Sequence, residues 1–517
     1  MSNTVSIENF IWWLSLLEPT NIADNQFELL NNFFYNKDKR IETRRGITTF
    51  WNSIWTNPIT SYFFFQRDDT WVRIAICTAW TNMYKYDEST WNRNSIKSWL
   101  SEFESDWVTR TRWSFAVYKN IIYMCNWVNS YASYDWTTYT EYATQPKVRY
   151  LQYMSDIIFG AWEDINPSTL YYINSASADA NTLNTNAVVV WWDELWRINW
   201  LKELGSIILV FKNSKIYSID LSGPSSTPID WQNGWYWQRN IKNVWNSLLY
   251  FNDTWFDTLK ARQWVSGADW LETLPLSDSL RPLIWNIEPK QYNNVIWLYA
   301  RPLTNYYTSF NTVWTDINNN TLVYSALTRW WSSYNLPSCY DYWYYIDSNW
   351  KYHYLIASAS WWQMFEIETW FDDLWSNIEY ELKTKQWDFW KPWLYKTFDY
   401  VDIIWLKSKW NDIECEIIID WEVESSGIIS DTNIVEWISA TKTLWSSPIW
   451  SLPLTWPAIT KDIEVYKYLI RIPLYSIWNT IQVRMYSNWV AQARTLDKIT
   501  ISKQDEAIDI FPYANIS

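Results

Sequence analysis

The sequence predicts an all-β protein in which a β-propeller of about six or seven blades is followed by a β-sandwich-like domain. Short apolar strands that begin after tight polar pairs dominate most of the chain. Longer alternating strands dominate the last part, and amphipathic helical patterns are scarce throughout. Together these three observations favour antiparallel sheets over a mixed or helical fold.

A repeated unit is the basis of the propeller prediction. In each copy a polar turn pair precedes an apolar strand, and these strands start at Ile121, Ile157, Ile207, Leu248 and Val295. The starts are 36, 50, 41 and 47 residues apart, and four-stranded propeller blades repeat about every 40–50 residues. Candidate copies near Val72 and Tyr354 extend the series to six or seven blades. A set of unrelated β-hairpins is the alternative, because strand spacing is regular in any all-β protein.

The chain is expected to divide into four regions. Residues 1–57 form an N-terminal arm and the entry to the first blade, and residues 58–375 form the propeller. Residues 376–503 form the sandwich-like domain, and residues 504–517 form an acidic tail. The strands expected in the third region are 378–384, 398–407, 413–423, 463–472 and 480–487.

Charge and cysteine content exclude several classes of protein. The chain carries 42 basic and 56 acidic residues, a net charge of -14, which argues against binding to a phosphate backbone. The four cysteines are far apart and form no C-x-x-C pair, so the sequence indicates neither a zinc site nor a disulfide framework, and buried thiols are expected at Cys77, Cys125, Cys339 and Cys415. No apolar stretch reaches the ~18 residues of a membrane span, and a soluble protein made in the cytosol is expected.

Tryptophan is abundant where glycine is scarce. The chain has 47 Trp and 7 Gly, although an average protein of this length has ~36 glycines. One hypothesis is an alternative genetic code, in which UGA encodes glycine and has been translated here as Trp. The other is a genuinely Trp-rich protein, such as a carbohydrate binder that stacks sugars on indoles.

Several Trp residues occupy expected glycine positions in turns. Asn349 and Trp350 lie between two predicted strands, where a hairpin favours Asn followed by Gly at positive φ. We therefore predict positive φ or tight turns at Trp127, Trp350 and Trp489 in particular. Similar Asp-Trp pairs occur at positions 135–136 and 420–421, and turns are also expected at the adjacent pairs 12–13, 191–192, 330–331 and 361–362.

The chain carries few residues suited to catalysis. His353 is the only histidine, so any Ser/His/Asp triad must use it, but no nucleophile motif lies near it. Asp372 and Asp373 could form a carboxylate pair, although acidic pairs in loops are usually solvated. The segment 133–139 is one residue short of the S-x-D-x-G-x-T-W motif of propeller glycosidases, and a hairpin turn explains it equally well. We expect no enzyme, catalytic residue, cofactor or metal site.

A basic cluster precedes the first predicted blade. In isolation such a cluster is usually a solvated face, and in an assembly it would face a neighbouring subunit. Its members are Lys37, Lys39, Arg40, Arg44 and Arg45.

When Trp is read as Gly, the first part of the chain resembles a family of tailed-phage tail and neck proteins. This family includes the podophage nozzle or tail-tubular-B type and the packaged-DNA stabilisation proteins. The opening resembles N-F-x-G-G-x followed by R-R-G-[YF], with Ile47 in place of the aromatic residue. The matching residues are Asn9, Phe10, Ile11, Trp12, Trp13, Leu14, Pro19 to Asn21, Asn31, Asn32, Thr43, Arg44, Arg45 and Gly46.

Two later segments extend the resemblance to about residues 5–370. Met83, Tyr84, Lys85, Tyr86 and Asp87 look like the K-L-Y-R-Y-D strand of the first blade. Residues 193–219 are similar to the signature I-T-G-L followed by L-V-F-K-x-x-S-I-Y.

The resemblance implies a structural protein of the virion, assembled in the host cytoplasm, with no catalytic residues. Its expected partners are other virion proteins and copies of itself in a ring around the DNA conduit, through which genomic DNA passes without specific binding. A carbohydrate-binding or adhesion propeller is the alternative.

Overall fold

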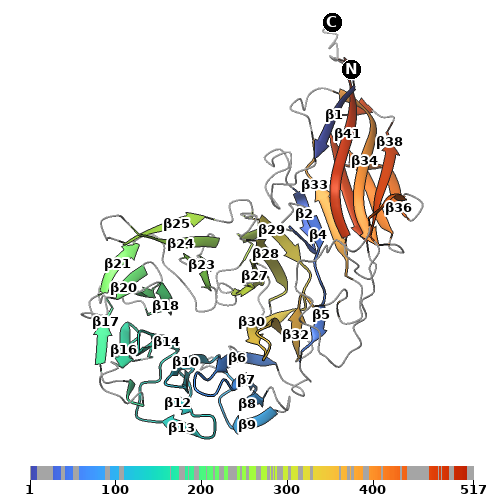
Figure 1. Ribbon diagram of the computed structural model, residues 1–517. Coiled ribbons are helices and arrows are strands. Elements are labelled where there is room, and N and C mark those ends of the chain that lie inside the picture. The colour runs from blue at the N-terminus through green and yellow to red at the C-terminus, as the bar shows by residue number, and fades with distance from the viewer. Residues whose placement is uncertain are drawn as a thin grey trace.

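The protein is an all-β molecule with a ring-shaped propeller and an elongated β-sandwich at its edge (Figure 1). The computed structural model describes residues 2–7 and most of 27–508. The longest stretches outside the described residues are 8–26, 231–241, 439–464 and 509–517. The predicted fold class, a propeller followed by a C-terminal sandwich, is confirmed.

Within the described residues the propeller has seven four-stranded antiparallel blades, of which the first six are meanders. Blade 1 contains β6 (Ile59–Gln66), β7 (Arg73–Ala79), β8 (Asn82–Asp87) and β9 (Arg93–Lys97). Blade 2 contains β10 (Ser114–Tyr118), β11 (Ile121–Cys125), β12 (Tyr131–Tyr134) and β13 (Tyr139–Tyr142). Blade 3 contains β14 (Tyr150–Met154), β15 (Ile157–Ala161), β16 (Thr169–Ile173) and β17 (Asn186–Val189). Blade 4 contains β18 (Trp200–Leu204), β19 (Ile207–Phe211), β20 (Ile216–Ile219) and β21 (Ser226–Asp230).

The remaining three blades complete the ring. Blade 5 contains β22 (Lys242–Val244), β23 (Ser247–Phe251), β24 (Phe256–Gln263) and β25 (Asp269–Pro275). Blade 6 contains β26 (Ile296–Ala300), β27 (Asn305–Phe310), β28 (Asn320–Ser325) and β29 (Trp330–Tyr334). Blade 7 contains β30 (Cys339–Ile346), β31 (Tyr352–Ser358), β32 (Met364–Ile367) and, from the N-terminal region, β5 (Ile47–Thr49).

Strand β5 closes the ring. It pairs antiparallel with β32, placing Ile47 opposite Ile367, and the chain then continues into β6 of blade 1. One hydrophobic cluster joins the blades on either side of this closure, with Tyr62 and Cys77 from blade 1 and Leu355 from blade 7. Closure by a strand from the other end of the propeller leaves blade 7 with a full set of four strands and protects its edge.

The propeller core lies between consecutive blades. Ile76 of blade 1 packs in one cluster with Met124 of blade 2, and Phe159 of blade 3 packs in another with Val210 of blade 4. Because each blade has a neighbour on both faces, its second strand needs apolar residues on both sides. The run Ile207–Phe211 therefore reads IILVF without alternation and is buried along most of its length.

The sandwich consists of two facing sheets. One contains β2 (Phe27–Asn31), β33 (Tyr380–Thr384), β40 (Ile481–Ser487), β35 (Ile413–Ile419) and β36 (Glu422–Ile429). The other follows the order β3 (Phe33–Tyr35), β4 (Ile41–Thr43), β41 (Arg494–Ile508), β34 (Tyr395–Ser408), β38 (Val465–Pro473) and β37 (Ile434–Ile438). Strand β35 alternates as sheets with one buried face do, and its buried side chains share a core with Ile403 and Trp405 of β34.

The N-terminal segment contributes strands to both domains. Strand β1 (Ser2–Ile7) pairs with β41, β2 pairs with β33, and β4 pairs with β41, so this segment completes the sandwich before β5 enters the propeller. The short strand β39 (Ile477–Trp478) pairs with β34. Strand β41 continues past residue 503 as far as Ile508, and Gln504 pairs with Ser2. Both ends of the described chain therefore lie together in the sandwich (Figure 1).

Most of the predicted strand positions match. The starts at Ile121, Ile157 and Ile207 each begin the second strand of a blade, and Leu248 lies in the second strand of blade 5. Val295 instead precedes the first strand of blade 6, because a second apolar strand, β27, follows β26. The single strand predicted at 413–423 is wrong: it is a hairpin, since a turn at Asp420 and Trp421 separates β35 from β36.

Candidate functional site: the joint between propeller and sandwich

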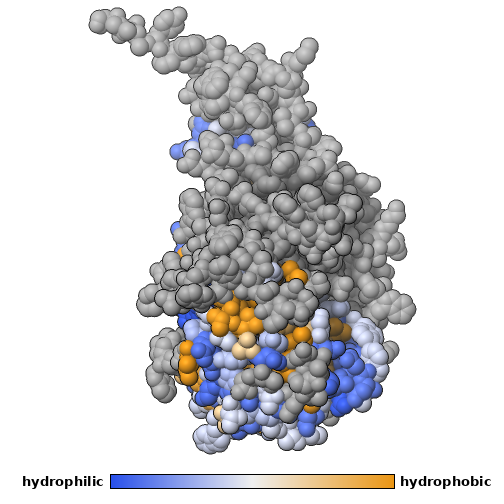
Figure 2. Space-filling model, turned by 90° about the vertical axis from the view of Figure 1, so that its left-hand side faces the viewer, coloured by the Kyte–Doolittle hydropathy of each residue, from blue (hydrophilic) through white to orange (hydrophobic). Residues whose placement is uncertain are grey.

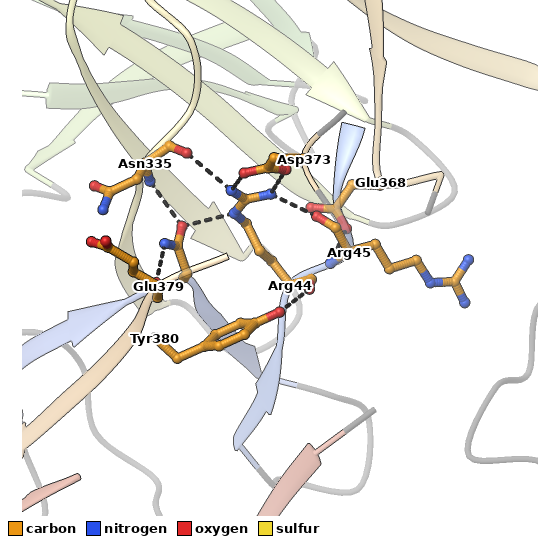
Figure 3. A network of polar contacts seen from close by, with 8 residues as sticks. Arg44, Arg45, Asn335, Glu368, Asp373, Glu379 and Tyr380 are labelled. Carbon is orange, nitrogen blue, oxygen red and sulfur yellow. Dashed lines mark hydrogen bonds and ion pairs between the residues drawn. The ribbon is translucent and has the colours of Figure 1, made fainter. Parts of the chain in front are cut away.

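Arg44 lies where the chain leaves the sandwich and enters the propeller. It follows β4 and precedes β5, and its side chain is 1% exposed. Around it meet the turn at Asn32, the end of blade 6 at Asn335 and the segment between β32 and β33 (Figure 3). Pairing of Asn31 in β2 with Ser333 in β29 brings the two domains together beside it.

The guanidinium of Arg44 donates hydrogen bonds in several directions (Figure 3). Nε donates to Asn32 Oδ1 at 2.7 Å, and Nη2 donates to the carbonyl of Asn335 at 2.9 Å. Nη1 donates to the carbonyl of Arg45 and to Asp373 Oδ1, each at 2.9 Å, and Nη2 also pairs with Asp373 Oδ2. The planar fork of arginine suits this bidentate contact with a carboxylate.

Asn32 extends the network to both domains. Its Oδ1 also accepts the backbone N–H of Asn335 at 2.8 Å, and its Nδ2 donates to the carbonyl of Glu379 at 2.6 Å. Asn32 has a φ of 61°, a left-handed conformation that asparagine tolerates better than most residues. One buried amide thereby connects blade 6, the sandwich and Arg44.

A second carboxylate lies next to this network. Glu368 Oε1 accepts the hydroxyl of Tyr307 at 2.9 Å, and Oε2 accepts the backbone N–H of Arg45 at 3.2 Å. Burial raises the pKa of Glu368 and outweighs the opposite effects of the Tyr307 hydrogen bond and of Arg44 and Arg45. Burial alone would lower the pKa of Arg44, but its hydrogen bond and charge interaction with Asp373 outweigh this, and the pKa lies above its ordinary value.

Two interpretations of the sequence need correction at this site. Arg44 belongs to the basic cluster interpreted as a solvated or partner-facing surface, but it is buried because Asp373 and Asn32 compensate its charge. Asp373, interpreted as a solvated loop residue, is the ion-pair partner of Arg44, with a side chain that is 20% exposed. Lys37, Lys39, Arg40 and Asp372 lie outside the described residues.

His353 lies in the sheet of blade 7 between two carboxylates. Its Nδ1 is 2.7 Å from Glu366 Oε1, and its Nε2 is 3.3 Å from Asp347 Oδ2. The ring also packs against Phe50 at 5.3 Å between centroids. The two ring nitrogens thus bridge the β30–β31 turn and β32 within the sheet of blade 7.

The segment that resembles a glycosidase motif is a hairpin turn between β12 and β13. Asp135 Oδ1 accepts hydrogen bonds from the backbone N–H groups of Thr137 at 3.0 Å and Thr138 at 2.7 Å, and from the Thr137 hydroxyl at 2.8 Å. These bonds lower the pKa of Asp135, the Thr138 N–H contributing most. These hydrogen bonds give the Asp135 carboxylate a structural role, which is to stabilise the turn.

The remaining candidates are the four cysteines and the side chains that could bind a metal ion. All four cysteines are buried free thiols, as predicted, and burial raises the pKa of each. Among the described residues no group of His, Cys, Asp and Glu side chains is arranged to hold a metal ion. No helix in the described part of the chain is both long and apolar enough to cross a membrane.

The predicted glycine-like geometry is confirmed at Trp127 and Trp350, whose φ angles are 59° and 63°. Trp489 lies outside the described residues. The turn predicted at positions 330–331 is wrong, because both residues belong to β29 and Trp331 packs in the core. The adjacent pairs 12–13, 191–192 and 361–362 lie outside the described residues.

No protein-family model matches the chain, and no curated protein sequence matches it. Solved structures similar to it include the Pan2 WD40 domain of Neurospora crassa, with 9% identity, 65% of this chain and 97% of that one covered, and a TM-score of 0.40. The β-propeller domain of Cps50 (Swd1) from Myceliophteria thermophila has 8% identity, coverage of 63% and 99%, and a TM-score of 0.41. Virginiamycin B lyase from Staphylococcus aureus has 7% identity, coverage of 71% and 100%, and a TM-score of 0.38.

Proposed function

We propose that this chain is a structural virion protein of a tailed bacteriophage, a component of the tail nozzle or head-tail neck that forms the DNA conduit. It acts without catalysis or a cofactor, and it is incorporated into the virion in the host cytoplasm. Its partners are neighbouring tail or neck proteins and further copies of itself.

The Arg44 network is the observation that carries this proposal. Arg44, Arg45 and Gly46 are the R-R-G residues on which the resemblance to phage tail proteins rests. In the structure Arg44 bonds to Asn335 of the propeller, to Asn32 beside the sandwich strand β2, and to Asp373 in the segment that leads from β32 to β33. A wall component must keep its domains in a fixed relation under load, and a buried multidentate joint suits this role because breaking it would leave charges unpaired.

The net charge of -14 supports a passive conduit. A wall that neutralised phosphates would hold the genome, whereas like charges repel DNA over a Debye length of about 10 Å at 0.1 M salt. We therefore propose that the acidic wall faces the DNA and that assembly forms a closed ring, the symmetry most homo-oligomers adopt.

Immunogold electron microscopy of purified phage particles tests the location. Antibodies against the recombinant chain are expected to label one pole of the particle, at the tail or neck. Label spread over the capsid, or an unlabelled particle alongside strongly labelled host-cell surfaces, would contradict the proposal. Preimmune serum is the control.

Exposed indoles favour a carbohydrate-binding or adhesion protein as the second candidate. Trp71 and Trp350 are 61% and 60% exposed, and their rings meet edge to face at 6.0 Å. The Arg73 guanidinium lies 5.2 Å from the Trp350 ring. Aromatic faces of this kind stack on sugars, and a glycan array probed with the chain and with a Trp71→Ala, Trp350→Ala variant would test it. Binding that persists in the variant would reject this site.

The molecule also carries hydrophobic side chains on its outer surface. Figure 2 shows them among hydrophilic residues on one side of the propeller. Exposed hydrophobic residues of the described part include Ile165 and Val189 in blade 3. Single apolar residues of this kind are normal on a protein surface and do not by themselves identify a binding site.

A further inference from the structure

The backbone places tryptophan in a conformation that tryptophan rarely adopts. Sixteen described residues other than glycine have positive φ, and eight of them are Trp. Trp accounts for 47 of 517 residues, so it is far over-represented in this group. Positive φ is uncommon outside glycine, with Asn and Asp as the usual exceptions, because the Cβ atom meets the backbone.

The turn between β35 and β36 is the clearest example. Only Asp420 and Trp421 separate the two strands, and their φ angles are 43° and 78°. Two-residue hairpins with positive φ at both positions strongly favour Asn-Gly or Asp-Gly. The side chain of Trp421 is 67% exposed, so packing of the indole does not offset the strain of a positive φ.

Other turns repeat this arrangement. Trp80 has a φ of 55° in the two-residue turn between β7 and β8, and its side chain is 48% exposed. Trp350 ends the turn between β30 and β31, where its N–H donates to the carbonyl of Asp347 at 3.0 Å. Trp136 has a φ of 85° in the β12–β13 turn, directly after Asp135. At Trp80, Trp350 and Trp421 the turn fits glycine and the indole is exposed. The Trp136 indole is half-buried, and its Nε1 donates to the carbonyl of Asn120 at 2.8 Å, so there the argument for glycine rests on the backbone conformation alone.

Trp162 differs from the tryptophans in these turns because its side chain is buried. Its φ is 63°. The guanidinium groups of Arg149 and Arg197 lie 4.4 Å and 4.3 Å from its ring. These contacts offset backbone strain, so the geometry does not favour glycine there as it does at the exposed turns.

We propose that the protein made in its native cell carries glycine in place of Trp71, Trp80, Trp99, Trp127, Trp136, Trp350 and Trp421, because UGA codons at these seven positions are translated as glycine. This assignment goes beyond the proposed function, although the resemblance behind that function is also seen when Trp is read as Gly. It removes the exposed indole pair of Trp71 and Trp350, so it also excludes the carbohydrate-binding alternative at that site.

Peptide mass spectrometry of the protein isolated from its native source is the direct test. Peptides that span the seven positions are expected to have the mass of glycine at each, and the gene is expected to have UGA there. Tryptophan masses or UGG codons at most of the seven would overturn the assignment. Presence of the protein in phage particles is scored separately, so failure of this assignment can be distinguished from failure of the proposed function.

A recombinant comparison tests the physical basis without the native source. The chain as printed is compared with a variant carrying Trp→Gly at all seven positions, and the variant is expected to melt at a higher temperature. Trp297→Gly and Trp405→Gly serve as matched controls because both side chains are buried without positive φ; each is expected to melt at a lower temperature. A sevenfold variant that melts below the printed chain would contradict the assignment.

Discussion

The charged guanidinium of Arg44 is almost entirely shielded from water, so we expect the stability of the fold to depend on its ion pair with Asp373. We expect Asp373→Asn to lower the free energy of unfolding by about 3–5 kcal/mol, the usual effect of breaking a buried ion pair. Chemical denaturation measures this. The matched control is Asp402→Asn, which removes the partner of Arg471, a side chain that is 57% exposed. The control is expected to have a much smaller effect, since exposed pairs contribute little, and equal losses would contradict a special role for the joint.

Glu368 predicts a pH dependence of stability. Its folded-state pKa lies above the ordinary value of 4.5 because burial disfavours the charged form. The folded protein therefore binds the proton more tightly than the unfolded chain, and this stabilisation is present below the ordinary pKa and lost as the pH rises through the raised one. Relative to Glu368→Gln, the wild-type chain is expected to lose stability across that window. A difference that stays flat or grows with pH would contradict the prediction.

The sequence could not show which arginine of the basic cluster is buried. Arg44 and Asp373 are 329 positions apart, and local charge patterns carry no information about such a contact. The R-R-G resemblance draws attention to the segment that contains Arg44. Only the fold shows that Asn32, Asn335 and Asp373 all contact the Arg44 guanidinium. By contrast, Asp135 and Trp350 act within their own hairpins, and the sequence predicted both turns.

At the scale of elements, β5 holds the propeller ring closed. Ile47 is 1% exposed and packs with Phe365 and Ile356 of blade 7. We expect Ile47→Ala to lower the free energy of unfolding by about 2–5 kcal/mol, as cavities in a core do. Thr49→Ala is the control on the same strand because Thr49 is exposed, and surface changes usually stay within about 0.5 kcal/mol. Comparable losses for both variants would mean that β5 does not pack as described.

Hairpins could be predicted element by element because their signals are local. Lys119 and Asn120 both have positive φ, as do Ser155 and Asp156, and these are the polar turn pairs that precede the predicted strand starts at Ile121 and Ile157. Crossovers could not be predicted in this way. The pairing of Ile41 with Leu496 and of Ile47 with Ile367 depends on which edges are free in the folded molecule. Strands as short as β4 and β5 have too few residues for a hydrophobic periodicity, so their partner strands cannot be predicted from the sequence.

For the whole molecule, repeat spacing and strand composition were enough to predict a propeller followed by a sandwich. They could not show that the N-terminal segment belongs to both. Because β1 pairs with β41 and β5 pairs with β32, the first fifty residues connect the two ends of the chain to the ring. The N-terminal segment thereby connects the sandwich to the ring, as suits the structural role that we propose for the chain.

Quantitative peptide mass spectrometry of purified phage particles tests this central proposal most directly. The chain is expected among the virion proteins, enriched with the particles through density-gradient purification, at a constant copy number relative to the other tail proteins. A protein that separates from the particles during purification, and is recovered instead from the host cell or its medium, would contradict the proposed function.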